Sequence, residues 1–264
     1  MRKLITSIVI VLSLLLAVPF SAYGEVCINT EETVISSVSE LKEELEMVQD
    51  DGIITDLEKE TLTACTDEAV INSFINEKLT EAVDVLDTED CTMSEGSTYE
   101  KKVYQLEDGC QLIVELEDCS EDESNIQTRA TSGSSTLWKA YGNRYFTAKA
   151  TVDFGLGTAT LQMQNHYILS KKGIDENYGT SAVSWTSSVV GDITRGTPVI
   201  TDAYARTVGA SDVNMYCYYT LTEGVENGTP ITTKYKIATT VGFVDLDTDE
   251  GKVKVKQSWK LTKV

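Results

Sequence analysis

The most concentrated set of potential metal ligands is a run of aspartates near the C-terminus. Asp245, Asp247 and Asp249 occupy alternate positions, and Gly251 follows them closely. Carboxylates with this spacing in a turn can converge on one calcium ion, which takes about six to eight oxygen ligands. The run departs from an Asp-x-Asp-x-Asp-Gly calcium loop, because Glu250 stands where the loop has glycine. The run is therefore either a calcium site or a solvated hairpin tip. We favour the hairpin tip, because motifs this short often match by chance.

His166 is the one histidine in the chain and the natural candidate for a general base. It alternates with Gln164 and Gln162 on a predicted strand, out of phase with the apolar residues. A histidine in that position could face a ligand groove. The sequence holds no serine nucleophile elbow and no HExxH zinc motif. We therefore interpret His166 as a residue of a candidate ligand-binding face and expect no catalytic site.

A basic face is predicted on the last strand. Lys252, Lys254 and Lys256 alternate with valines, so their side chains share one side of that strand. Such a face could bind cell-wall polymer, glycan, anionic lipid or another anionic surface, or the acidic N-terminal part of the same chain. It could equally protect an edge strand from aggregation. Tyr216 and Tyr218 could add a stacking platform for sugars. The same basic set extends to Lys234, Lys236 and Lys260.

Six cysteines indicate disulfide bonds if the chain enters an oxidising compartment. They are Cys27, Cys65, Cys91, Cys110, Cys119 and Cys217. No CxxC pair is present, which argues against a zinc or thioredoxin-type site. All pairings are open from sequence. Local geometry favours the pairs Cys27–Cys65 and Cys91–Cys119, which leaves Cys110–Cys217 as the third pair.

The first 24 residues have the pattern of a secretory signal peptide. Arg2 and Lys3 precede an apolar run over residues 4–18, and small residues lead up to Gly24. We expect cleavage after Gly24 and a secreted, extracellular protein. No later stretch is long and apolar enough to predict a membrane span.

Charge divides the rest of the chain into two parts. Residues 25–128 contain 30 acidic side chains and 5 lysines, whereas residues 129–264 contain 12 acidic and 15 basic side chains. The acidic excess disfavours nucleic acid as a partner, because a phosphate backbone requires cationic contacts. With 41% hydrophobic residues, the chain also has the composition of a globular protein.

The elements expected from periodicity follow the same division. Residues 25–120 predict an acidic helical region that ends in a β-hairpin over 99–116, centred on an Asp-Gly turn. Residues 121–136 are polar and read as a linker. Residues 137–264 alternate between apolar and polar types, which predicts an antiparallel β-sandwich or open barrel. The fold class expected is therefore α+β.

Two functions fit these features. The first is a secreted, non-enzymatic extracellular binding or interaction protein. The alternative is an acidic pro-region joined to a cationic β-domain, a toxin or antibacterial effector that is released by cleavage near Arg129. No cofactor other than the calcium ion considered above is expected.

Overall fold

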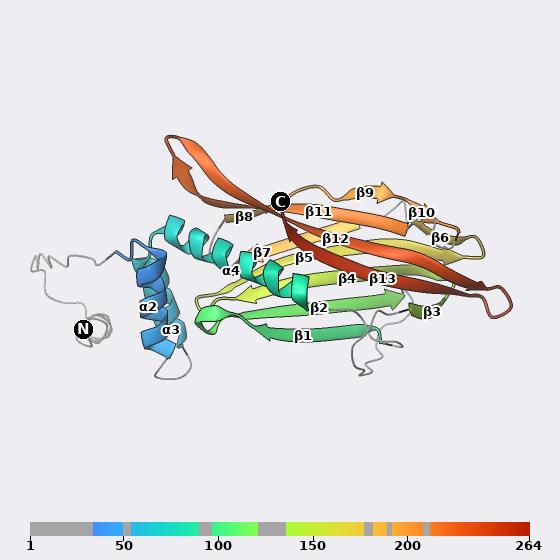
Figure 1. The fold of residues 1–264 in the computed structure, drawn as a ribbon, viewed down its shortest axis with the longest axis horizontal. Coiled ribbons are helices and arrows are strands. Elements are labelled where there is room, and N and C mark those ends of the chain that lie inside the picture. Colours follow the sequence, from blue (N-terminus) through green and yellow to red (C-terminus); the bar gives the residue numbers. More distant parts are fainter. Residues whose placement is uncertain are drawn as a thin grey trace, which may run out of the picture. The chain divides into compact units, whose positions relative to one another are not determined.

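The computed structural model describes residues 34–49, 54–89, 97–120, 136–176, 182–188, 192–207 and 212–264. All of them belong to one compact unit, Val34–Val264. Three helices come first in this unit, and two antiparallel sheets follow them (Figure 1). The prediction of an α+β fold with a C-terminal β-sandwich is confirmed. The predicted signal peptide, residues 1–24, lies outside the described residues.

The helices are α2 (Val38–Gln49), α3 (Asp56–Cys65) and α4 (Glu68–Thr88). The start of α3 is fixed by a capping box. The Thr55 hydroxyl accepts a hydrogen bond from the Glu58 amide at 3.3 Å, and the Glu58 carboxylate accepts one from the Thr55 amide at 2.8 Å. This reciprocal pair satisfies two amides that the helix leaves free.

Helix α4 packs its apolar stripe against the sandwich. Phe74, Ile75 and Leu79 are fully buried on this stripe, and the ring of Phe74 meets Phe154 edge-on at 6.4 Å. The helix also contacts strands of both sheets, namely β4 (Gly142–Asp153), β11 (Asp212–Glu226) and β13 (Lys252–Lys263). The Tyr235 hydroxyl donates to Asn76 Oδ1 at 2.6 Å and so ties α4 to the six-stranded sheet. The helix therefore shares the core of the sandwich.

The first sheet has seven strands and runs mainly as a meander. Consecutive strands pair in antiparallel register, as hairpin connections allow. Its order is β1 (Tyr99–Gln105), β2 (Gln111–Ser120), β4 (Gly142–Asp153), β5 (Thr158–Ser170), β6 (Gly173–Glu176) and β10 (Tyr204–Ala205), with β7 (Ala182–Ser188) also paired to β5.

The second sheet has six strands and faces the first. Its two long central strands form one hairpin, which Figure 1 shows extending past the neighbouring strands at one end. The order is β3 (Thr136–Ala140), β13 (Lys252–Lys263), β12 (Thr229–Asp247), β11 (Asp212–Glu226) and β8 (Asp192–Arg195), with β9 (Val199–Asp202) also paired to β11.

The predicted hairpin belongs to the main sheet. Strand β2 pairs along its whole length with β4, from Gln111 opposite Asp153 to Ser120 opposite Arg144. The predicted linker lies between these strands, and its residues 121–135 are outside the described part of the chain. Residues on both sides of it therefore build a single sheet.

Candidate functional site

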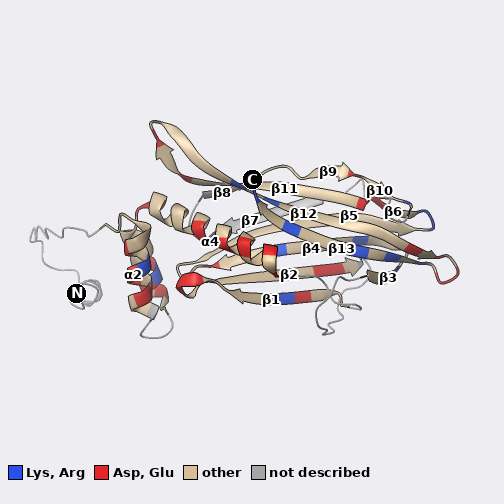
Figure 2. Cartoon of the chain, in the orientation of Figure 1, with Lys and Arg blue, Asp and Glu red and all other residues tan. Residues whose placement is uncertain are grey.

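The three lysines of the predicted basic face lie together on the outer side of the six-stranded sheet. Lys252, Lys254 and Lys256 alternate on β13 with Val253 and Val255, which are fully buried between the sheets. Alternate residues of a strand point to opposite faces, so the lysines point away from the core. Figure 2 shows lysines along β12 and β13, with acidic residues at the tip that joins these strands and on α4.

Aromatic rings accompany this face, which we call the lysine face. Lys236 Nζ lies 4.3 Å above the centroid of the Tyr216 ring, and the rings of Tyr216 and Tyr218 meet at 5.2 Å. At the other end of the sheet, Lys254 Nζ lies 5.8 Å from the centroid of Trp138 on β3, a side chain that is 44% exposed. These are cation–π distances, and they hold ring faces and ammonium groups side by side. The lysine face consists of Lys234, Lys236, Lys252, Lys254, Lys256 and Lys260 with Trp138, Tyr216 and Tyr218.

Most of these lysines have no acidic partner. Lys252 pairs with Glu250 at 2.6 Å, and Lys260 pairs with Asp87 of α4 at 3.1 Å. No carboxylate among the described residues lies within 4.0 Å of the other four ammonium groups. The four are Lys234, Lys236, Lys254 and Lys256. In a chain with a net charge of −20, lysines without acidic partners among the described residues, beside aromatic rings that are at least partly exposed, mark this surface as distinct.

The structure places His166 away from the lysine face. His166 lies on β5 of the seven-stranded sheet, between the fully buried Asn165 and Tyr167, so it points out from the opposite side of the sandwich. Its ring stacks 5.7 Å from Tyr145, and its Nε2 lies 2.5 Å from Gln164 Oε1. The predicted ligand-face residues therefore do not form one surface.

The predicted calcium ligands stabilise a turn between β12 and β13. Asp247 Oδ1 accepts hydrogen bonds from the amides of Asp249 at 3.0 Å and Glu250 at 2.9 Å. Asp245 Oδ1 accepts one from the next amide in the chain. In the described part of the chain, no three His, Cys, Asp or Glu side chains are grouped so that they could hold a metal ion. This geometry fits a solvated hairpin tip.

The predicted Cys110–Cys217 bridge is not formed in this structure. Both thiols are buried and free: Cys110 follows the β1–β2 turn of one sheet, and Cys217 lies within β11 of the other. The Cys217 thiol donates to the Gly196 carbonyl at 3.2 Å. Burial raises the pKa of Cys110 to about 12, so this thiol stays protonated. The other two predicted pairings involve Cys27 and Cys91, which lie outside the described residues.

A cluster of polar side chains lies between the two sheets. Asp118 on β2 is fully buried, and its carboxylate pairs with Lys139 of β3 at 2.6 Å. The Tyr167 hydroxyl donates to Asp118 at 3.0 Å and accepts from the Gln257 amide at 3.0 Å. Burial raises the pKa of Tyr167 well above its ordinary value, so it remains a neutral hydrogen-bond donor. The cluster thus connects β2 and β5 of one sheet to β3 and β13 of the other.

Arg144 belongs to this interior cluster and has no anionic partner. It lies directly opposite Tyr167 in the β4–β5 register and is only 7% exposed. Its Nε makes no hydrogen bond, and no described carboxylate lies within 4.0 Å of it. The side-chain oxygens of Asn165 and Gln257 are also buried without a partner, although their amide groups donate to other residues. Buried polar atoms are normally satisfied, so this group requires an explanation.

The sequence carried a signal for the interior cluster. On β4 the alternate residues Phe146, Ala148 and Ala150 are buried on one face of the strand. Arg144 precedes Phe146 by two positions and therefore lies on the same face. Extending each apolar alternation by one step therefore reaches a buried polar residue of this cluster. The steps lead to Asp118 after Leu116, to Lys139 after Leu137, to Asn165 after Met163 and to Gln257 after Val255.

A second buried cation lies under α4. Lys78 is fully buried and pairs with Asp108 at 2.7 Å and Glu81 at 3.0 Å, while Lys42 of α2 pairs with Asp108 at 3.1 Å. Burial disfavours the charged form of Lys78, but hydrogen bonds to Asp108 and Glu81 outweigh the effect of burial. The pKa of Lys78 is therefore raised. Burial likewise disfavours the charged form of Asp108, yet hydrogen bonds from the two lysines lower its pKa. This network joins α2, α4 and the β1–β2 turn.

Comparison with known proteins does not indicate a function for this chain. The chain matches no protein-family model, no curated protein and no solved structure. None of the helices in the described residues is long and apolar enough to cross a membrane. A functional proposal therefore depends on the geometry of the molecule.

Proposed function

We propose that the protein is an exported, non-enzymatic binding protein whose lysine face binds an extended anionic polysaccharide. The observation that carries this proposal is the set of four lysines without acidic partners among the described residues, beside the exposed Trp138 and the half-buried Tyr216 and Tyr218. Export is inferred from the signal-peptide pattern of residues 1–24.

A polymer fits this face better than a small ligand. Alternate lysines on one strand are about 7 Å apart, so Lys252, Lys254 and Lys256 offer three evenly spaced charges over about 13 Å of β13. A chain with a repeated carboxylate or phosphate group can contact several of them at once. Tyr216 and Trp138 offer flat apolar surfaces against which sugar rings can pack.

Calorimetric titration with alginate, a polyuronate, tests the proposal directly. We expect binding at low ionic strength that weakens as salt is added, because exposed charges are screened. Uncharged dextran should not bind. The combined substitution Lys236→Ala, Lys254→Ala and Lys256→Ala should weaken alginate binding at least about tenfold, which corresponds to about 1.4 kcal/mol.

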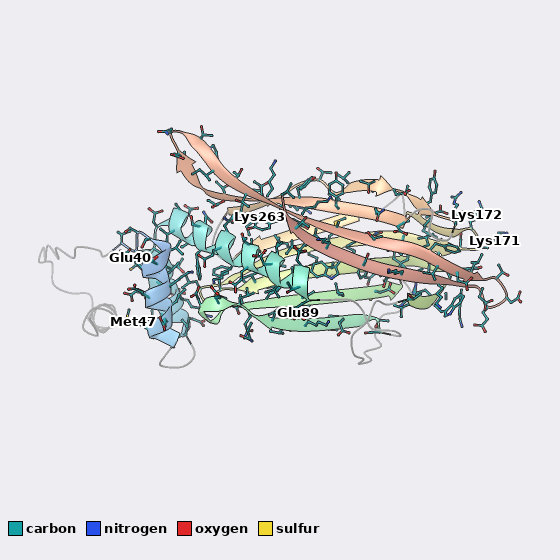
Figure 3. The ribbon with its side chains drawn as sticks, in the orientation of Figure 1. Glu40, Met47, Glu89, Lys171, Lys172 and Lys263 are labelled. Carbon is teal, nitrogen blue, oxygen red and sulfur yellow. The ribbon has the colours of Figure 1, made fainter. Side chains whose placement is uncertain are left out.

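A matched control is available at the β5–β6 turn. Lys171 and Lys172 are exposed there (Figure 3), on the seven-stranded sheet, whereas the lysine face belongs to the six-stranded sheet. Replacing both by alanine removes two lysines and should leave alginate binding nearly unchanged. Equal weakening by both sets of substitutions would mean that only net charge matters, and it would overturn the proposal. So would unchanged binding by the triple variant.

The alternative, a β-domain released by cleavage near Arg129, receives less support from the fold. Residues 99–120 provide β1 and β2, and β2 is hydrogen-bonded to β4 along its whole length. Release would leave β4 as an open sheet edge, which favours aggregation. It would also remove Phe74 of α4 from the core.

A further inference from the structure

We propose that the interior cluster at Arg144 is a binding site for one small monovalent anion, either a halide or a small carboxylate. The site lies between the sheets and is separate from the lysine face on the outer side of the molecule. The inference therefore stands or falls independently of the proposed function.

Charge is the first argument. Among the described residues, the cluster holds two cations, Lys139 and Arg144, against the single carboxylate of Asp118. That carboxylate is already engaged, since it accepts from Tyr167 and pairs with Lys139. A buried charge without a partner is costly, and a guanidinium cannot avoid the cost by losing its proton. One monovalent anion would balance the cluster.

Hydrogen bonding is the second argument. Arg144 Nε is a donor without an acceptor, which is what an anion supplies. The unpartnered oxygens of Asn165 and Gln257 are acceptors and would repel an anion in direct contact. A water molecule between them and the anion satisfies both sides, because water donates two hydrogen bonds. An anion bound at Arg144 would thus be accompanied by at least one ordered water.

The location sets the size of the anion. The neighbouring Tyr167 and Phe146 are almost entirely buried, so the surroundings are closely packed. Arg144 is the third residue of β4, close to the end of the strand, and it retains 7% exposure. A chloride or formate ion matches these surroundings, whereas a bulky organic anion such as gluconate does not.

Crystals of the full chain grown in sodium bromide would locate the ion. We expect an anomalous peak within hydrogen-bond distance of Arg144 Nε, inside the sandwich. Ordered water alone at this position, with no anomalous signal, would overturn the proposal.

Thermal unfolding provides the solution test. At constant ionic strength, the wild-type protein should melt several degrees higher in chloride or formate than in gluconate, because a ligand that binds only the folded state stabilises it. A difference between the chloride and formate arms would identify the preferred class of anion. Identical melting temperatures in all three salts would contradict the proposal.

Two arginine variants separate this effect from general salt effects. Arg144→Met removes the donor and should abolish the difference between chloride and gluconate. Arg206 pairs with Asp175 at 2.6 Å on the surface, so Arg206→Met should retain the wild-type difference. An Arg144→Met protein that keeps the full anion response would overturn the assignment. If this variant does not fold, Arg144→Lys should fold and show a reduced response, and an unreduced response would count against the site.

Discussion

Lys78 is expected to contribute to stability, because its ammonium group is buried while its carboxylate partners reach water. Lys78→Met would keep the aliphatic packing, leave Glu81 without its cation and leave Asp108 paired with Lys42 alone. We expect the free energy of unfolding to fall by about 2 kcal/mol, less than for a fully buried pair because both carboxylates are partly solvated. Urea denaturation measures this change. Lys59→Met on exposed α3 is the control and should have little effect.

The same network predicts a dependence on pH. The pKa of Asp108 is lowered in the folded state, so its contribution to stability is present above its unfolded pKa, about 3.9, and disappears as the pH falls through the folded value. Asp108→Asn preserves the turn, in which this residue has φ of 55°, a conformation that asparagine also tolerates. The variant should be less stable than wild type by about 1.5 kcal/mol at pH 7. Urea midpoints at pH 7 and pH 3 should show this gap closing in acid, and a constant gap would contradict the assignment.

At the level of elements, α4 is the helix on which the sandwich depends. Phe74 is fully buried against Phe154, and its truncation leaves a cavity between helix and sheet. Phe74→Ala should lower the free energy of unfolding by about 3–5 kcal/mol. Leu57→Ala on α3 removes an exposed side chain and should change it by less than about 0.5 kcal/mol. Similar urea midpoints for Phe74→Ala and wild type would mean that α4 is not part of the core.

The elements also show what could be predicted from sequence and what could not. The capping box at Thr55 and the strand alternation identified helices and strands, because local chemistry determines both. The pairing of β2 with β4 was not predictable from the polar run between them. Sheet partners depend on contacts far apart in sequence, so His166 was placed with lysines that belong to the other sheet. Arg144 was missed because alternation was followed only through apolar residues.

For the whole molecule, the shared sheet predicts the outcome of a cut in residues 121–135. A specific protease site introduced there should yield two fragments that remain together, because β2 stays paired with β4 and α4 stays packed on β11. We expect the cleaved protein to elute with the intact protein in gel filtration, and the fragments to separate only in concentrated denaturant. Separation in native buffer would favour the released β-domain instead.

The path of the chain through β3 has a consequence for folding. The chain leaves the seven-stranded sheet after β2, adds β3 to the other sheet, and returns to form β4. Most neighbouring strands are joined by short turns and can pair quickly, but Thr136 of β3 pairs with Lys256, more than one hundred positions away. Closing so long a loop costs entropy before any contact is gained. The pairing of β3 with β13 is therefore expected to be a slow, late step of folding.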